Sequence, residues 1–95
     1  MNYTTELSGF RSEIDAIDRA LVELIAKRFK VADCVIEVKK TKNISAALPD
    51  RIEQVVQNVL AHAQKTNVPP QAIEKLWRIL IAETIAYEEK VLNTK

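Results

Sequence analysis

Residues 5–42 read TELSGFRSEIDAIDRALVELIAKRFKVADCVIEVKKTK and contain a long apolar repeat. Apolar side chains recur at two positions of a seven-residue period, which together we call the seam: Leu7, Phe10, Ile14, Ile17, Leu21, Leu24, Val31, Val35 and Val38. With no proline to interrupt it, this pattern predicts one long helix. At 1.5 Å per residue such a helix spans roughly 55 Å, too long for the remaining residues to cover. The sequence therefore predicts an intertwined homodimer.

One position of the seam holds a charged residue, Arg28, where an apolar residue is expected. A guanidinium group in an apolar seam is costly unless a carboxylate or a bound anion pairs with it. Arg28 could pair with an acid on another helix, or it could bind an anionic ligand. Both interpretations remain open at this point.

Two further helices are expected, over residues 49–66 and from the Pro69–Pro70 pair to about Asn93. Their apolar faces differ in polarity. The inward positions predicted for the first of these helices are Ile52, Val55, Val56, Val59, Leu60 and Ala63. Those predicted for the second are Ile73, Leu76, Trp77, Leu80, Ile81, Thr84, Ile85, Glu88, Val91 and Leu92. The connection over 43–48 has small side chains and is expected to be mobile. The chain is thus predicted to be all-α, a single domain over 1–95.

Composition excludes several classes of function. The 95 residues carry a formal net charge of +1, so nothing favours nucleic acid or an anionic membrane as a partner. The first residues do not resemble a secretion signal, and no apolar run is long enough to span a membrane. A single cysteine, Cys34, forms no internal disulfide, suits the cytoplasm and is expected to be structural. The single histidine, His62, can build neither a metal site nor a catalytic triad, so no cofactor is expected.

Polar residues at apolar positions define a candidate site. Arg28 and Lys39 are eleven residues apart and project from nearly the same side of the first helix. Arg11 lies off that side and could instead reach the pocket of an antiparallel partner. Arg51 begins the second helix. Thr84 and Glu88 lie on one face of the third helix. Together these groups would make a cationic cavity with one carboxyl group, suited to a small dicarboxylate. Taken singly, Lys39 and Arg11 are more simply solvated cations, and Glu88 the polar edge of its stripe.

With these positions in place, the chain resembles the all-helical (AroQ-class) chorismate mutases and their relative isochorismate pyruvate lyase. The resemblance covers nearly the whole chain. It is carried by FRSEIDAIDRALVELIAKR at 10–28, Lys39, PDRIEQV at 49–55 and LWRILIAETIAYEE at 76–89. It implies the type II chorismate mutase fold, an intertwined helical dimer with two equivalent sites, and conversion of chorismate to prephenate without metal or cofactor.

The resemblance also implies a role for each site residue. Arg28, and Arg11 of the other chain, would hold the two substrate carboxylates. Lys39 would bond the ether oxygen and a carboxylate. Arg51 would add positive field and Thr84 would help hold a carboxylate. Residue 88 would face the ether oxygen from the side opposite Lys39.

Two positions depart from the enterobacterial pattern. Glu88 replaces a glutamine, and it must carry a proton to donate to the ether oxygen, so activity is expected to fall as the pH rises. Leu48 and Ile52 replace acids that bind the C4 hydroxyl of chorismate. Isochorismate, with loss of pyruvate to give salicylate, and an amino-substituted chorismate therefore stay open as substrates. A non-catalytic helical dimerisation or regulatory module is the alternative that is not an enzyme.

Overall fold

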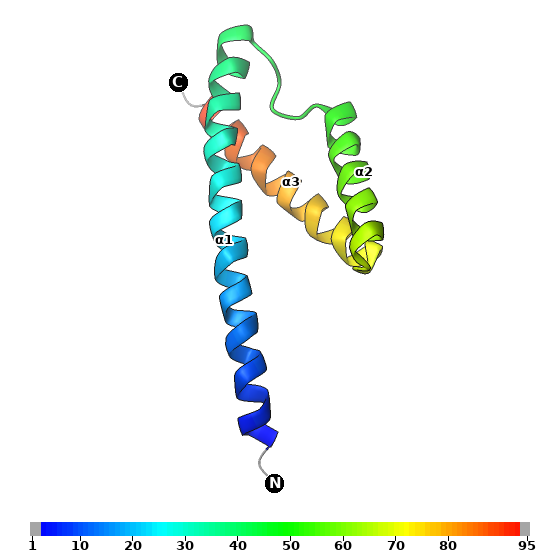
Figure 1. The fold of residues 1–95 in the computed structure, drawn as a ribbon. Helices are drawn as coiled ribbons and strands as arrows, with labels where there is room; N and C mark the ends of the chain where they lie inside the picture. Colours follow the sequence, from blue (N-terminus) through cyan, green and yellow to red (C-terminus); the bar gives the residue numbers. More distant parts are fainter. Residues whose placement is uncertain (1–2, 94–95) are drawn as a thin grey trace. The chain divides into compact units, whose positions relative to one another are not determined.

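The computed structural model describes residues 3–93, with side chains from residue 5 onward, and these residues form three helices (Figure 1). Helix α1 covers Tyr3–Lys42, α2 covers Pro49–Thr66 and α3 covers Pro70–Leu92. The predicted all-helical order, with a long first helix, is confirmed. Helix α1 begins two residues earlier than predicted. The chain divides after Val31 into two compact units.

The first unit, up to Val31, is the greater part of α1. No side chain of residues 5–31 is buried, although the helix carries six large apolar seam residues before Val31. Their exposed fractions range from 37% at Leu7 to 64% at Phe10. Exposed side chains of this kind along a helix contribute nothing to a core of this chain. The seam therefore stands open in the single chain.

The second unit, from Ala32 onward, holds the core. Buried apolar side chains come from all three helices, and among the described residues they are Ala32, Ile36, Val56, Ala63 and Ile81. Within the part of the chain that the structure describes, only Ile36 and Val56 are large and fully buried. Fully burying one aliphatic side chain stabilises a fold by about 1.5–3 kcal/mol, so a core of this size contributes little stability for a domain.

The predicted inward faces are largely correct, with two corrections on α3. All six predicted residues of α2 are buried or half-buried. On α3, however, Leu76 is 59% exposed and Val91 is 37% exposed. Leu76 lies about 100° around the helix from the half-buried Trp77, outside the face that packs on α2. Val91 lies in the last turn of α3. The face assigned to α3 from sequence was therefore too wide.

An asparagine in the left-handed conformation ends each of the first two helices. Asn43 has a φ of 57°, and the N–H of Ile44 then donates to the carbonyl of Lys39 at 2.8 Å. Asn67 has φ 59° and ψ 34°, and its N–H donates to the carbonyl of Ala63. Asparagine tolerates this backbone conformation better than most residues. Each asparagine therefore lets the chain leave its helix without strain.

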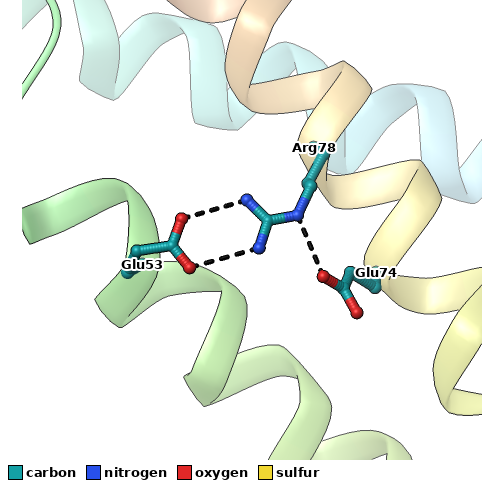
Figure 2. A network of polar contacts seen from close by, with 3 residues as sticks. All are labelled: Glu53, Glu74 and Arg78. Atoms are coloured by element: carbon teal, nitrogen blue, oxygen red, sulfur yellow. Dashed lines mark hydrogen bonds and ion pairs between the residues drawn. The ribbon is translucent and has the colours of Figure 1, made fainter. Parts of the chain in front are cut away.

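An exposed ion network ties α2 to α3 (Figure 2). The Arg78 guanidinium donates to both carboxylate oxygens of Glu53, at 3.0 and 3.2 Å, and to Glu74, at 3.0 Å. The hydrogen bond from Arg78 lowers the pKa of Glu53, and the hydrogen bond to Glu53 raises the pKa of Arg78. Such a bidentate pair fixes geometry as well as adding attraction. It fastens the middle of α3 to the first half of α2.

A second polar contact joins α3 to the C-terminal part of α1. The hydroxyl of Tyr87 donates to a carboxylate oxygen of Asp33. This hydrogen bond raises the pKa of Tyr87, since ionisation would remove the donor beside a carboxylate.

Over the residues described, none of the three helices has both the length and the apolar character that crossing a membrane requires.

Candidate functional site

Lys39 and Glu88 form the centre of the candidate site. The ammonium of Lys39 donates to Oε1 of Glu88 at 2.8 Å, and the side chains are only 12% and 8% exposed. Glu88 is the only polar or charged residue among the buried residues described. Burying two charges is costly unless they pair closely, and this contact is at ideal length. The structure thus brings together two predicted site residues that are 49 positions apart in the chain.

The connection between α1 and α2 supplies a third member of this cluster. Lys39 also donates to the backbone carbonyl of Ala46, at 2.8 Å. The prediction of a mobile connection rested on the small side chains at Ala46 and Ala47, but the anchor here is main-chain. Sequence reasoning missed Ala46 because a backbone carbonyl leaves no signal in the residue type.

Thr84 lies one turn before Glu88 and is half-buried. Its hydroxyl donates to the carbonyl of Leu80 at 2.7 Å, as threonine often does within a helix. A threonine hydroxyl can accept a hydrogen bond as well as donate one. Thr84 and Glu88 share one face of α3, as the four-residue spacing predicts.

Arg51 lies in the first turn of α2 and is exposed. Its guanidinium donates to Oε1 of Gln54 at 2.6 Å, a contact within the same helix. Among the described residues, therefore, no hydrogen bond or ion pair joins Arg51 to Lys39 or Glu88.

Leu48 and Ile52 mark the start of α2. Leu48 is its N-cap residue, with φ −123° and ψ 97°, and its carbonyl accepts from the N–H of Ile52 at 3.0 Å. No side chain caps this terminus, since a leucine offers no acceptor. Leu48 is 39% exposed and Ile52 is half-buried. The side chains at these two positions offer apolar surface and no hydrogen-bonding group.

The two remaining predicted cations belong to the first unit. Arg28 is half-buried and Arg11 is exposed. Their roles as carboxylate ligands stay predictions, and so does the delivery of Arg11 across a dimer interface.

A hollow of about 530 Å³ adjoins Lys39 and opens to solvent. It lies among the C-terminal end of α1, the 43–47 connection and the C-terminal end of α3. Its lining residues are Lys39, Lys40, Asn43, Ile44, Ser45, Ala46, Ala47, Glu89, Leu92 and Asn93. Of the predicted site residues only Lys39 lines this hollow. Because Glu88, Arg28 and Thr84 do not line it, the hollow is not the predicted cationic pocket.

The remaining sequence candidates are peripheral. Cys34 is a free thiol and is exposed in the single chain, and His62 is also exposed. Within residues 3–93 no group of three His, Cys, Asp or Glu side chains could hold a metal ion.

The predicted site residues thus include one paired, nearly buried ammonium, that of Lys39, and two apolar side chains at positions 48 and 52. A fixed ammonium can stabilise negative charge that develops on a substrate atom. Groups of this kind occur in sites that hold and polarise an anionic ligand. Comparison with known proteins agrees: the chain belongs to the chorismate mutase type II family, whose sequence profile matches residues 10–89.

Individual relatives support the family assignment. The chain is 32% identical over 83 residues to the T-protein of Enterobacter agglomerans, covering 87% of this chain and 22% of that protein. It is 29% identical over 88 residues to the chorismate mutase of Methanocaldococcus jannaschii, covering 93% and 89%. It is 28% identical over 87 residues to the 4-amino-4-deoxychorismate mutase of Streptomyces pristinaespiralis, covering 92% and 67%. The chain spans less than a quarter of the length of the T-protein it matches.

Proposed function

We propose that this protein is a chorismate mutase, an isomerase that converts chorismate to prephenate. The observation that carries the proposal is the nearly buried Lys39–Glu88 pair, at 2.8 Å, in a chain of the type II family. A buried lysine in a small helical protein needs a reason, because an aliphatic residue would pack there at lower cost. A substrate with negative charge provides that reason.

The proposed reaction is an intramolecular rearrangement. A C–O bond breaks at the ether oxygen while a C–C bond forms at the other end of the same molecule, so no nucleophile and no metal is required. The enzyme must hold the enolpyruvyl group over the ring and stabilise the negative charge that develops on the ether oxygen. Lys39 is proposed to donate to this oxygen. Arg28, Thr84 and Arg51 are proposed to bind or attract the carboxylates.

We propose that the functional form is an intertwined homodimer and that Arg11 reaches the partner's site. The nine seam residues support the dimer, because their exposed fractions lie between 37% and 64% in the single chain. An apolar stripe of that length on a soluble protein marks an interaction surface. A seven-residue repeat, moreover, is the pattern with which helices pack against one another. We place the whole chain, 1–95, in this one domain, and we place the protein in the cytoplasm.

A second candidate substrate differs from chorismate in the substituent at C4. Leu48 and Ile52 are apolar, so neither can accept a hydrogen bond from a C4 hydroxyl. One relative that the chain resembles over 92% of its length is named a 4-amino-4-deoxychorismate mutase. An amino-substituted chorismate is therefore the second candidate substrate. Isochorismate, with elimination of pyruvate, is the third.

Product identification tests the proposal. Purified protein is incubated separately with chorismate, isochorismate and 4-amino-4-deoxychorismate, and the products are identified by NMR spectroscopy. The proposal expects prephenate from chorismate as the fastest conversion. Faster rearrangement of 4-amino-4-deoxychorismate would show that this compound, and not chorismate, is the preferred substrate. Formation of salicylate and pyruvate from isochorismate would show that the protein is a lyase and not a mutase. No conversion of any of the three would support a helical dimerisation module instead.

A further inference from the structure

Two hydrogen bonds join the C-terminal part of α1 to α3. In the first, the ammonium of Lys39 donates to Glu88 at 2.8 Å. In the second, the hydroxyl of Tyr87 donates to the Asp33 carboxylate. The two residues on α3 are consecutive, whereas the two on α1 are six positions apart, which is about 9 Å along a helix axis. The two bonds therefore hold one turn of α3 at two separate points of α1.

The backbones of these two helices do not approach closely. From Ala32 onward, no Cα atom of α1 lies within 8 Å of a Cα atom of α3 among the described residues. Ile36, midway in sequence between Asp33 and Lys39, is only 2% exposed. Burial of an aliphatic side chain is favourable without a preferred direction, so it stabilises the core but does not fix the rotation of one helix against another. Hydrogen bonds are directional and can fix that rotation.

We infer that Tyr87 and Asp33 are positioning residues of the proposed site: their hydrogen bond fixes the rotation of α3 about its own axis and so keeps Glu88 opposite Lys39. This inference rests on the proposed function, because it assigns the two residues a part in that reaction. It requires no particular protonation state of Glu88, since a carboxyl oxygen can accept from Lys39 in either state. Neither Tyr87 nor Asp33 is among the site residues predicted from the sequence.

A small rotation of α3 is enough to disturb the site. Side chains end about 5–6 Å from the axis of a helix, so a rotation of about 10° moves the carboxyl group of Glu88 by about 1 Å. Lys39 has a flexible side chain, and its ammonium would follow this carboxyl group away from the position in which it is proposed to meet the ether oxygen. A displacement of about 1 Å caused by a change far from the reacting atoms can lower a rate about a hundredfold.

The Tyr87–Asp33 hydrogen bond suits this role better than a role in stability. Both residues are exposed, Tyr87 by 38%, so water can replace either partner and the loss of the bond costs the fold little. The acceptor is a carboxylate, and such charge-assisted bonds are about twice as strong as neutral ones. The bond raises the pKa of Tyr87 above its ordinary value of 10.0, so the hydroxyl remains a donor throughout the neutral range.

Steady-state kinetics with chorismate test the inference. The control is Glu37→Ala, which removes an exposed carboxylate one turn after Asp33 on α1. We expect Tyr87→Phe and Asp33→Ala each to lower kcat about tenfold to a hundredfold, with a smaller change in KM. Asp33→Asn keeps an acceptor oxygen, so this variant, like the control, should stay within about threefold of wild type. An unchanged kcat in either Tyr87→Phe or Asp33→Ala would overturn the inference.

A double-variant comparison separates positioning from a general weakening of the fold. The change Tyr87→Phe is made again in a protein that carries Lys39→Gln, and the residual rates are compared. If Tyr87 acts through the contact between Lys39 and Glu88, its hydroxyl has nothing left to position there. We then expect Tyr87→Phe to change the residual rate by no more than about threefold. A loss by the same factor as in the protein with Lys39 intact would overturn the inference.

A second measurement needs no turnover. The carboxyl ¹³C signal of Glu88, observed by NMR spectroscopy in the ligand-free protein, reports the surroundings of that group. We expect the signal to shift in Asp33→Ala, because the rotation of α3 changes, and to stay in place in Glu37→Ala. A signal that Asp33→Ala leaves in place would overturn the inference even if chorismate is converted. Absence of turnover with every candidate substrate would overturn the proposed function and the catalytic part of this inference, while the signal would still decide whether Asp33 holds Glu88 in position.

Discussion

A charge placed in the seam should separate the proposed dimer, and Val31→Glu is the sharpest such change. Val31 is 63% exposed in the single chain, so a glutamate there meets no clash within the chain. Completing the burial of one valine is worth about 1 kcal/mol, and a symmetric interface counts it twice. Each uncompensated buried carboxylate adds a further 1–3 kcal/mol or so. The total, at least about 4 kcal/mol for each dimer, raises the dissociation constant about a thousandfold.

Sedimentation equilibrium across a range of concentrations measures this effect. The control is Lys30→Glu, which changes charge at the adjacent exposed residue outside the seam and should shift stability by no more than about 0.5 kcal/mol. Because the core of the second unit is small, we expect Val31→Glu also to lower the melting temperature in a concentration-dependent way. An unchanged dimer in Val31→Glu, or a monomeric wild type at micromolar concentration, would refute the seam as a dimer interface.

Three other predictions concern the site and its support. Lys39→Met should lower kcat by about 10²–10³-fold in steady-state assays. Because it leaves Glu88 buried without its partner, it should also destabilise the fold by about 3 kcal/mol in denaturant unfolding. The double variant Lys39→Met/Glu88→Leu should recover the stability but not the activity. Leu48→Asp should raise kcat/KM for chorismate about twofold to tenfold, mainly through KM, because it supplies one acceptor for the C4 hydroxyl, and Ala47→Asp should not. The variant Arg78→Gln removes the ion pair with Glu53, and the lowered pKa of Glu53 gives the direction of the pH effect on stability. The ion pair stabilises the fold above pH 4.5, the ordinary pKa of glutamate, and this stabilisation is lost as the pH falls through the lowered pKa. The melting-temperature difference between wild type and Arg78→Gln should therefore vanish in acid, and a difference that grows in acid would contradict the assignment.

Periodicity was sufficient to predict the three helices. Two local signals carried this prediction: the seven-residue repeat of α1, and the prolines near the starts of α2 and α3. They do not fix how wide a buried face is. Leu76 and Val91 show this, because their burial depends on the neighbour that each turn of α3 meets.

The candidate site was predictable in its residue types and less so in its contacts. Lys39 and Glu88 were identified as polar residues at positions that favour apolar ones, and the structure joins them directly. The sequence did not reveal that Ala46 would hold Lys39 through its carbonyl, since any residue has that group. Nor did it reveal that Arg78, one of several basic residues on α3, would bridge Glu53 and Glu74. Such contacts depend on the path of the backbone and on the register of one helix against another.

Subunit complementation tests the central claim, a catalytic pocket shared between two chains, most directly. Arg11→Ala and Lys39→Gln are each expected to be nearly inactive. In a heterodimer of the two, one site combines Lys39 of the first chain with Arg11 of the second, and the other site has neither. After unfolding and refolding of an equimolar mixture, half of the dimers are mixed and each has one working site, so about a quarter of wild-type activity should return. A mixture no more active than the separate variants would contradict the shared pocket.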